Sequence, residues 1–154
     1  MHHQRIQLPH CPMDAYIPTL KTAPGVKRPS VVICPGGGYE HLSDREAEPI
    51  ALGFNNAGFN AVVVRYSVAP ARFPTALLEV ATAVKYVREE GVKYGCDPDR
   101  IFVIGFSAGG HLALAAGVKG ENKPNAMILG YPAVTTPNNP MSNFMVKLLS
   151  GKKE

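Results

Sequence analysis

Ser107 stands between a short apolar run, residues 101–104, and an alanine-rich segment with helical spacing, residues 108–117. Together with its neighbours it forms a Gly-x-Ser-x-Gly pattern. This pattern predicts a sharp turn from a strand into a helix, with the serine hydroxyl exposed at the turn. Backbone and side chains come very close at such a turn, so the residues two before and two after the serine must be tiny. Gly105 and Gly109 meet that requirement.

Apolar runs and helical segments alternate along the rest of the chain. The runs are apolar on both faces, which is typical of buried parallel strands; they are residues 30–35, 60–67 and 126–132. Helical spacing predicts helices over residues 43–57, 74–94, 108–117 and 141–149. This order predicts an α/β protein with a mostly parallel sheet flanked by helices.

Local signals add one segment and refine two of those above. Residues 15–20 are predicted to be an edge strand, because proline is tolerated at the edge of a sheet. Ser43-Asp44-Arg45-Glu46 has the spacing of a capping box, so its acidic and basic residues are interpreted as helix-start residues. In the helix over 74–94, the apolar stripe is predicted to face the core and Glu79 to lie on the opposite face.

The composition restricts the class of protein. With 154 residues, 45% hydrophobic and 18% charged, the chain is expected to form a single folded domain over residues 1–154. The net charge is +4, but the basic residues are scattered, so no nucleic-acid partner is predicted. The absence of a long apolar run predicts no membrane association, and no secretory signal is visible.

The cysteine count bears on the compartment and on metals. Cys11, Cys34 and Cys96 are an odd number without metal-type spacing. They predict buried free thiols in a reducing, cytoplasmic compartment and no metal site.

Acyl transfer needs a nucleophile, a base and donors for the oxyanion. Ser107 is the candidate nucleophile, and the backbone N–H of Ala108 would point towards the developing oxyanion. A second donor can come from the Gly36-Gly37-Gly38 loop, if the strand before it neighbours the strand before Ser107. The alternative interpretation of that loop is a plain flexible turn.

Three stretches resemble the esterases of the α/β-hydrolase family. Cys34-Pro35-Gly36-Gly37-Gly38-Tyr39 resembles their glycine-rich oxyanion loop, with Pro35 where the lipase form has histidine. Residues 65–76 are similar to the family's stretch ahead of its long helix, and residues 97–113 to its nucleophile segment. The most similar branch is that of the bacterial esterases that include carbohydrate acetyl esterases.

The resemblance covers residues 30–135 and carries expectations about function. It implies an α/β-hydrolase fold, Ser107 as the nucleophile, and an oxyanion hole formed by Gly37, Gly38 and Ala108. It implies a small-molecule ester or an acetylated sugar as substrate, and no cofactor is expected.

The chain departs from the family pattern after Ser107. The family's acid and histidine follow the serine, yet here only Glu121 and His111 precede the terminal Glu154. His111 is predicted to be a packing or hydrogen-bonding residue, because its helix runs down into the fold. His41 is either near Ser107 by chance or a substitute base, and His10 cannot be placed. The chain is therefore expected to be a truncated relative.

These observations bear on three functions. The first is hydrolysis of acetyl or short acyl esters by Ser107. The second is an inactive homologue that forms a homo-oligomer through an open edge strand at residues 126–131. The third, nucleotide binding, is disfavoured because the chain has neither Gly-x-Gly-x-x-Gly nor Gly-Lys-Ser/Thr.

Overall fold

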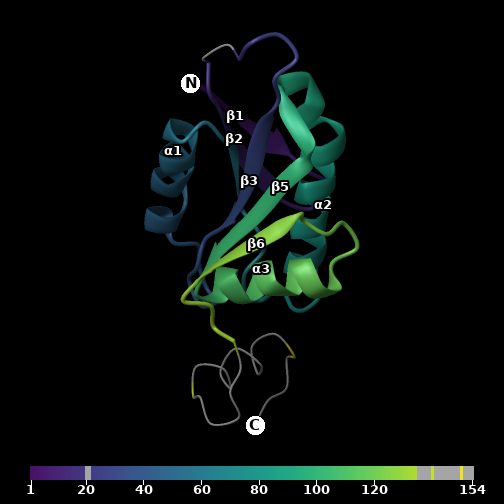
Figure 1. Cartoon of the computed structure of the whole chain (residues 1–154). Helices are drawn as coiled ribbons and strands as arrows, with labels where there is room; N and C mark the ends of the chain where they lie inside the picture. Colours follow the sequence, from purple (N-terminus) through teal and green to yellow (C-terminus); the bar gives the residue numbers. More distant parts are fainter. Residues whose placement is uncertain (20–21, 135–139, 141–149, 151–154) are drawn as a thin grey trace.

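The chain folds around one six-stranded sheet (Figure 1). A computed structural model describes residues 1–19, 22–134, 140 and 150. The strands lie in the order β1 (His2–Gln7), β2 (Pro12–Ile17), β4 (Asn60–Val64), β3 (Arg28–Cys34), β5 (Cys96–Phe106) and β6 (Ala126–Gly130). β1 and β2 run antiparallel to their neighbours, whereas β4, β3, β5 and β6 are parallel. The predicted α/β class with a mostly parallel sheet is confirmed.

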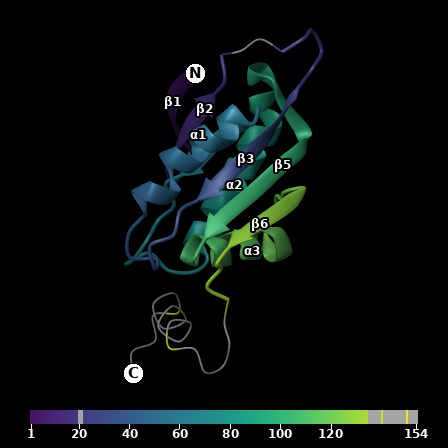
Figure 2. The same ribbon diagram turned by 60° about the vertical axis from the view of Figure 1, so that its left-hand side comes forward.

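Helices cover both faces of the sheet, which is why its central strands are apolar throughout. Val31 and Ile33 pack in a cluster with residues of α1 (Glu48–Asn56). Val32 and Cys34 alternate with them and pack towards α2 (Thr75–Glu89) and α3 (Ala108–Lys119). Figure 2 shows α1 on one side of the sheet and α2 on the other.

The N-terminal prediction is wrong in one respect. The strand expected over 15–20 is β2, and it lies inside the sheet between β1 and β4. Pro18 follows the last residue of β2, so it removes no ladder donor and does not force the strand to the edge. The edge position belongs to β1, whose polar residues are mostly exposed.

The helix boundaries differ from the predicted ones where glycine and proline intervene. The capping box is not formed: Ser43 makes no side-chain cap hydrogen bond, and Asp44–Glu46 is a separate 3-10 turn, η1. The helix over 74–94 divides into α2 and a second 3-10 turn, η2 (Gly91–Tyr94). It ends at Gly95, whose positive φ of 79° stops the helix as expected.

The prediction that Glu79 lies on the face of α2 opposite the core is wrong. Its side chain is buried, with 2% exposure. Its carboxylate accepts hydrogen bonds from the backbone N–H and the hydroxyl of Ser67, both at 2.6 Å. Glu79 therefore ties α2 to the segment that follows β4.

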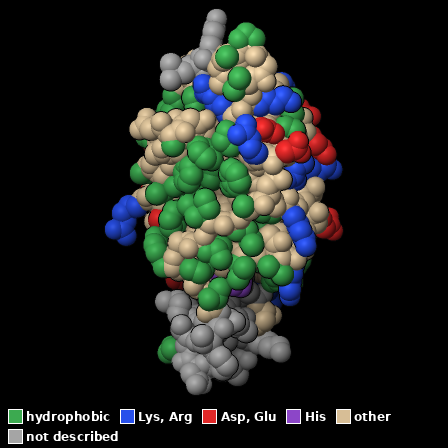
Figure 3. All heavy atoms as spheres, viewed as in Figure 1, with side chains coloured by type: hydrophobic (Ala, Val, Ile, Leu, Met, Phe, Trp, Pro, Cys, Tyr) green, Lys and Arg blue, Asp and Glu red, His purple; other side chains and the backbone are tan. Residues whose placement is uncertain are grey.

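β6 forms an apolar edge of the described sheet. Met127, Ile128 and Leu129 are 37%, 43% and 36% exposed. Figure 3, in the view of Figure 1, shows hydrophobic side chains gathered in the middle of this side of the molecule. The helix predicted over 141–149 lies outside the described residues. Among the described helices, none is long and apolar enough to cross a membrane.

Candidate active site

Ser107 is the single residue between β5 and α3. Its backbone has φ 52° and ψ −117°, a positive φ that residues with a side chain rarely adopt. The strand and the helix that the sequence predicts on either side of Ser107 are both present. Strain of this kind gathers at functional sites, where the surrounding structure holds it in place.

Gly105 and Gly109 make the turn possible because their neighbours leave no room for a side chain. A Cβ at Gly105 would overlap the carbonyl oxygen of Gly109. A Cβ at Gly109 would overlap the carbonyl oxygens of Cys34 and Pro35. The first turn of α3 is therefore pressed against the ends of both β5 and β3.

The glycine loop lies beside this turn because β3 and β5 are neighbours, as expected from the sequence. Cys34, the last residue of β3, pairs with Gly105 of β5. In the loop Gly37, Gly38 and Tyr39 have positive φ values of 132°, 65° and 59°. A Cβ at Gly37 would overlap the backbone carbonyl of His41, so the loop is tightly folded.

Hydrogen bonds hold the loop to the segments around it. The hydroxyl of Tyr66 donates to the carbonyl of Pro35, and the N–H of Ser43 donates to the carbonyl of Gly36 at 2.9 Å. The N–H of Ala69 donates to the carbonyl of Tyr39 at 2.7 Å. The glycine loop is thus a fixed part of the fold rather than a plain flexible turn.

Three of the predicted site residues meet at one open hollow of about 640 Å³. Ser107, Gly37 and Gly38 line it, along with Glu40, His41, Ser43, Arg45, Glu46, Tyr131 and Pro140. Ala108 is the first residue of α3 and is buried directly after Ser107.

The two histidines near Ser107 lie in different surroundings. His111 Nδ1 is 2.9 Å from the hydroxyl of Tyr39 and hydrogen-bonded to it. Burial lowers the pKa of His111, which favours its neutral form. The predicted hydrogen-bonding role of His111 is confirmed. His41 lines the hollow of Ser107, and its ring lies near Gly37.

The Ser107 hydroxyl has no hydrogen-bonded base within the described part of the chain. His10 lies in the turn between β1 and β2, and is exposed. The cysteines offer no competing nucleophile: all three are free and buried, as predicted. Burial raises the pKa of Cys34 to about 12, which keeps it a thiol at neutral pH.

Glu46 and Tyr131 belong to the site, although the sequence alone did not single them out. The Glu46 carboxylate accepts hydrogen bonds from the N–H of Gly36 at 2.7 Å and from the hydroxyl of Tyr131 at 2.6 Å. Its spacing from Ser43 favoured a capping box instead. No local pattern could reveal a partner 85 residues away.

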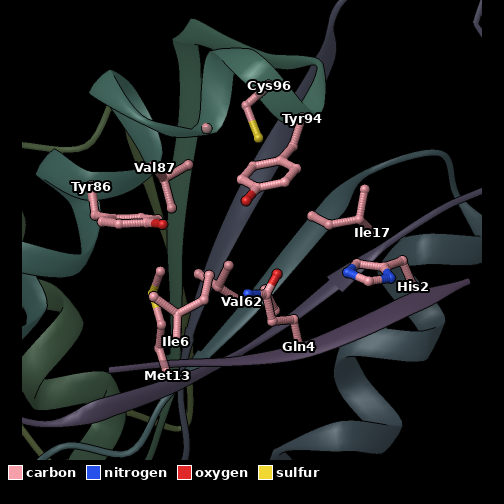
Figure 4. A pocket seen from close by; sticks show the side chains of 12 residues that line it. His2, Gln4, Ile6, Met13, Ile17, Val62, Tyr86, Val87, Tyr94 and Cys96 are labelled. Atoms are coloured by element: carbon pink, nitrogen blue, oxygen red, sulfur yellow. The ribbon is translucent and has the colours of Figure 1, made fainter. Parts of the chain in front are cut away.

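Two other hollows lie away from Ser107. The small one between β1, β2 and α2 (Figure 4) has about 20 Å³, room for about one water molecule. The larger has about 600 Å³ and is mainly apolar; Tyr39, Leu77, His111 and Val118 are among the residues that line it. In the described residues no group of three or more His, Cys, Asp or Glu could hold a metal ion.

Comparisons with known proteins agree with this geometry. A model of the BD-FAE family matches residues 13–146. Endo-1,4-beta-xylanase B of Butyrivibrio fibrisolvens is 34% identical over 128 residues, which are 72% of this chain and 20% of that protein. Acetylxylan esterase of Xylanibacter ruminicola is 30% identical over 109 residues, 69% of this chain and 23% of that protein.

Two solved structures share the fold. An α/β hydrolase from a Medee basin deep-sea metagenome library is 41% identical with a TM-score of 0.82, and the match covers 90% of this chain and 60% of that one. An acetyl ester-xyloside bifunctional hydrolase from Caldicellulosiruptor lactoaceticus is 32% identical with a TM-score of 0.82, covering 93% and 56%. The chain thus spans 20–23% of these curated relatives and 56–60% of these structures. The chain belongs to the BD-FAE family, esterases with the α/β-hydrolase fold.

Proposed function

We propose that the protein hydrolyses carboxylic esters of acetyl or other short acyl groups, with Ser107 as the nucleophile. The observation that carries the proposal is the strained turn at Ser107, which shares one hollow with Gly37 and Gly38. A strand-to-helix turn of this kind exposes the serine hydroxyl at the carboxyl edge of the sheet. The names of the relatives, among them an acetylxylan esterase, support an acetylated carbohydrate as the alcohol part.

The reaction would proceed through an acyl-enzyme. Ser107 Oγ attacks the carbonyl carbon of the ester, and the N–H groups of Ala108, Gly37 and Gly38 stabilise the oxyanion. The alcohol leaves with a proton, and the acyl group remains on Ser107. Water then attacks the acyl-serine and releases the carboxylic acid.

His41 is the candidate proton acceptor within the described residues. Its imidazole lies at the same hollow as Ser107, whereas His111 is hydrogen-bonded to Tyr39 beside the other, apolar hollow. Histidine is the side chain that most often takes up the proton in general base catalysis.

The second candidate is an inactive homologue that acts through self-association. Two observations favour it: the Ser107 hydroxyl lacks a hydrogen-bonded base in the described residues, and β6 presents an apolar edge. An uncovered strand edge pairs readily with another chain. In this alternative the edge-to-edge partner is a second copy of the chain.

Turnover of p-nitrophenyl acetate separates the two candidates. The proposal predicts turnover by the wild type that falls to the uncatalysed rate in Ser107→Ala. Replacing the base, His41→Gln, is expected to lower kcat by about 10²–10⁴. Absence of turnover by the folded wild type would refute the proposed hydrolysis, and unchanged turnover in Ser107→Ala would assign the reaction to another residue. Unchanged kcat in His41→Gln would exclude His41 as the base.

A further inference from the structure

The carboxylate of Glu46 joins two segments that come from opposite sides of the Ser107 turn. One oxygen, Oε2, accepts the N–H of Gly36 in the glycine loop after β3. The other, Oε1, accepts the hydroxyl of Tyr131, which follows β6. β5, the strand that ends at Ser107, lies between β3 and β6. Glu46 therefore spans the turn from one neighbouring strand end to the other.

The contacts around Gly36 show how closely these parts are packed. A Cβ built on Gly36 would lie 2.7 Å from Glu46 Oε2, 2.7 Å from the carbonyl oxygen of Phe106 and 3.2 Å from Ser107 Cβ. Glu46 Oε2 and Ser107 Cβ both lie close to this one position, so they are near each other. A shift of the glycine loop would change the surroundings of Ser107 directly.

The segment after β6 is attached to the same turn through the backbone. The N–H of Ser107 donates to the carbonyl of Gly130 at 3.0 Å, and the N–H of Ala133 donates to the carbonyl of Ser107 at 2.9 Å. The hydrogen bond from the Tyr131 hydroxyl to Glu46 connects this segment to the glycine loop, since Glu46 also accepts the N–H of Gly36. Three strand ends are thus linked around one residue.

Glu46 itself is unsuited to stabilising the oxyanion. A carboxylate beside a developing oxyanion would repel it. Here each carboxylate oxygen already accepts a hydrogen bond, one from the loop backbone and one from a tyrosine hydroxyl. Two hydrogen bonds from one side chain to two different segments suit the fixing of a loop.

We propose that Glu46 is a positioning residue, which fixes the glycine loop and the Tyr131 segment around Ser107 so that the oxyanion donors are aligned before the substrate binds. The inference rests on the proposed function for its catalytic consequence, since preorganised oxyanion donors stabilise the transition state without a cost of reorganisation. The linkage itself concerns the fold and can be measured without any turnover.

Amide hydrogen exchange of the full chain tests the linkage first. In Glu46→Ala, exchange is expected to accelerate at least tenfold in residues 36–39 and at Tyr131 and Ala133, and to stay unchanged in β4 and α2. Tyr131→Phe removes one of the two bonds and is expected to accelerate exchange at residue 131 and Ala133 more than in the glycine loop. Glu48→Ala is the matched control, because Glu48 is exposed and lies two residues away in the first turn of α1. Unchanged exchange at Gly36 in Glu46→Ala would overturn the proposal.

Kinetics with p-nitrophenyl acetate test the catalytic consequence. Glu46→Ala is expected to lower kcat at least tenfold while KM changes less than threefold. Glu46→Gln, whose amide oxygen can still accept the N–H of Gly36, is expected to recover most of the lost kcat. An equal loss in Glu46→Gln and Glu46→Ala would contradict positioning, because it would mean that the charge itself takes part. A wild type without turnover would refute the proposed function, while hydrogen exchange would still decide whether Glu46 links the two segments.

Discussion

At the scale of single residues, the turn at Ser107 depends on glycines that no other residue can replace. Gly109→Ala would drive a Cβ into the carbonyl oxygens of Cys34 and Pro35, both of them backbone atoms that cannot rotate away. We expect it to lower the free energy of unfolding by about 3 kcal/mol or more, since overpacking against fixed atoms is costly. Urea unfolding of the purified variant measures the change.

A glycine elsewhere supplies the control for that prediction. Gly53 lies inside α1, and a Cβ there would meet nothing within 4 Å. Gly53→Ala is therefore expected to raise the free energy of unfolding by about 0.5–1 kcal/mol through helix propensity. Equal effects of the two substitutions would refute the packing account of the turn.

His111 makes the stability of the fold depend on pH. Burial lowers its pKa in the folded protein, so the unfolded chain takes up a proton here at higher pH than the folded one does. The free energy of unfolding is therefore expected to fall as the pH drops below about 6.5, the ordinary histidine value. The protonated ring would also lose the ability to accept a hydrogen bond from the Tyr39 hydroxyl.

Urea unfolding at about pH 7.5 and about pH 5.5 measures this dependence. His111→Gln should remove a large part of the loss on acidification, whereas His10→Gln, in an exposed turn, should leave it unchanged. The same loss in His111→Gln as in the wild type would show that other groups cause it.

Residues differ in how far the sequence reveals them. The turn at Ser107 is encoded within five residues, so its strand and helix could be predicted. Glu46 could not, because its partner Tyr131 is remote in sequence and meets it only through the order of strands in the sheet. Glu79 could have been found: it is spaced three and four residues from the buried Ala76 and Ala83, on the same face of α2.

At the scale of elements, Glu79 links α2 to the segment after β4. Glu79→Ala would leave the N–H and hydroxyl of Ser67 without their acceptor. We expect a loss of about 2 kcal/mol in the free energy of unfolding, because the donors lose a charged acceptor near the core. Glu89→Ala, at an exposed position of the same helix, is the control and should change stability by less than about 0.5 kcal/mol. A comparable loss in both variants would contradict the linkage.

The edge of β6 leads to a prediction about association. Its central residues Met127, Ile128 and Leu129 carry no charge to oppose pairing with another strand. If β6 pairs with a second copy, the average mass in light scattering should rise with concentration, and Ile128→Lys should shift it towards the monomer. A wild type that stays monomeric at every concentration would remove β6 from consideration as an interface.

The order of helices and strands along the chain was predicted more accurately than the residues at which they begin and end. Buried strands such as β3 and β4 are visible because both faces are apolar, which is a pattern of the sequence itself. β1 escaped notice because it is polar and held by β2 on one side only. The break between α2 and η2 falls at Gly91, which packs against Cys96. A Cβ built on Gly91 would lie only 2.9 Å from the sulfur of Cys96. No local sequence pattern shows this contact.

At the scale of the whole molecule, the chain contains the strained turn at Ser107 and the glycine loop, and it matches part of the length of its solved relatives. It spans 56–60% of the two solved hydrolases, and its described sheet ends at an apolar strand. The loops after β3, β5 and β6 nevertheless meet around Ser107 and are hydrogen-bonded to one another. The contacts on which the proposed role of Ser107 depends therefore all lie within this chain.

Covalent labelling of that serine tests the central claim most directly. A fluorophosphonate reacts with an activated serine, whose oxygen bonds to phosphorus as fluoride leaves. Intact-mass and peptide analysis of the folded chain should find one adduct, located on Ser107 and absent from Ser107→Ala. A folded wild type that stays unlabelled, or an adduct that persists in Ser107→Ala, would contradict the assignment of Ser107 as the nucleophile.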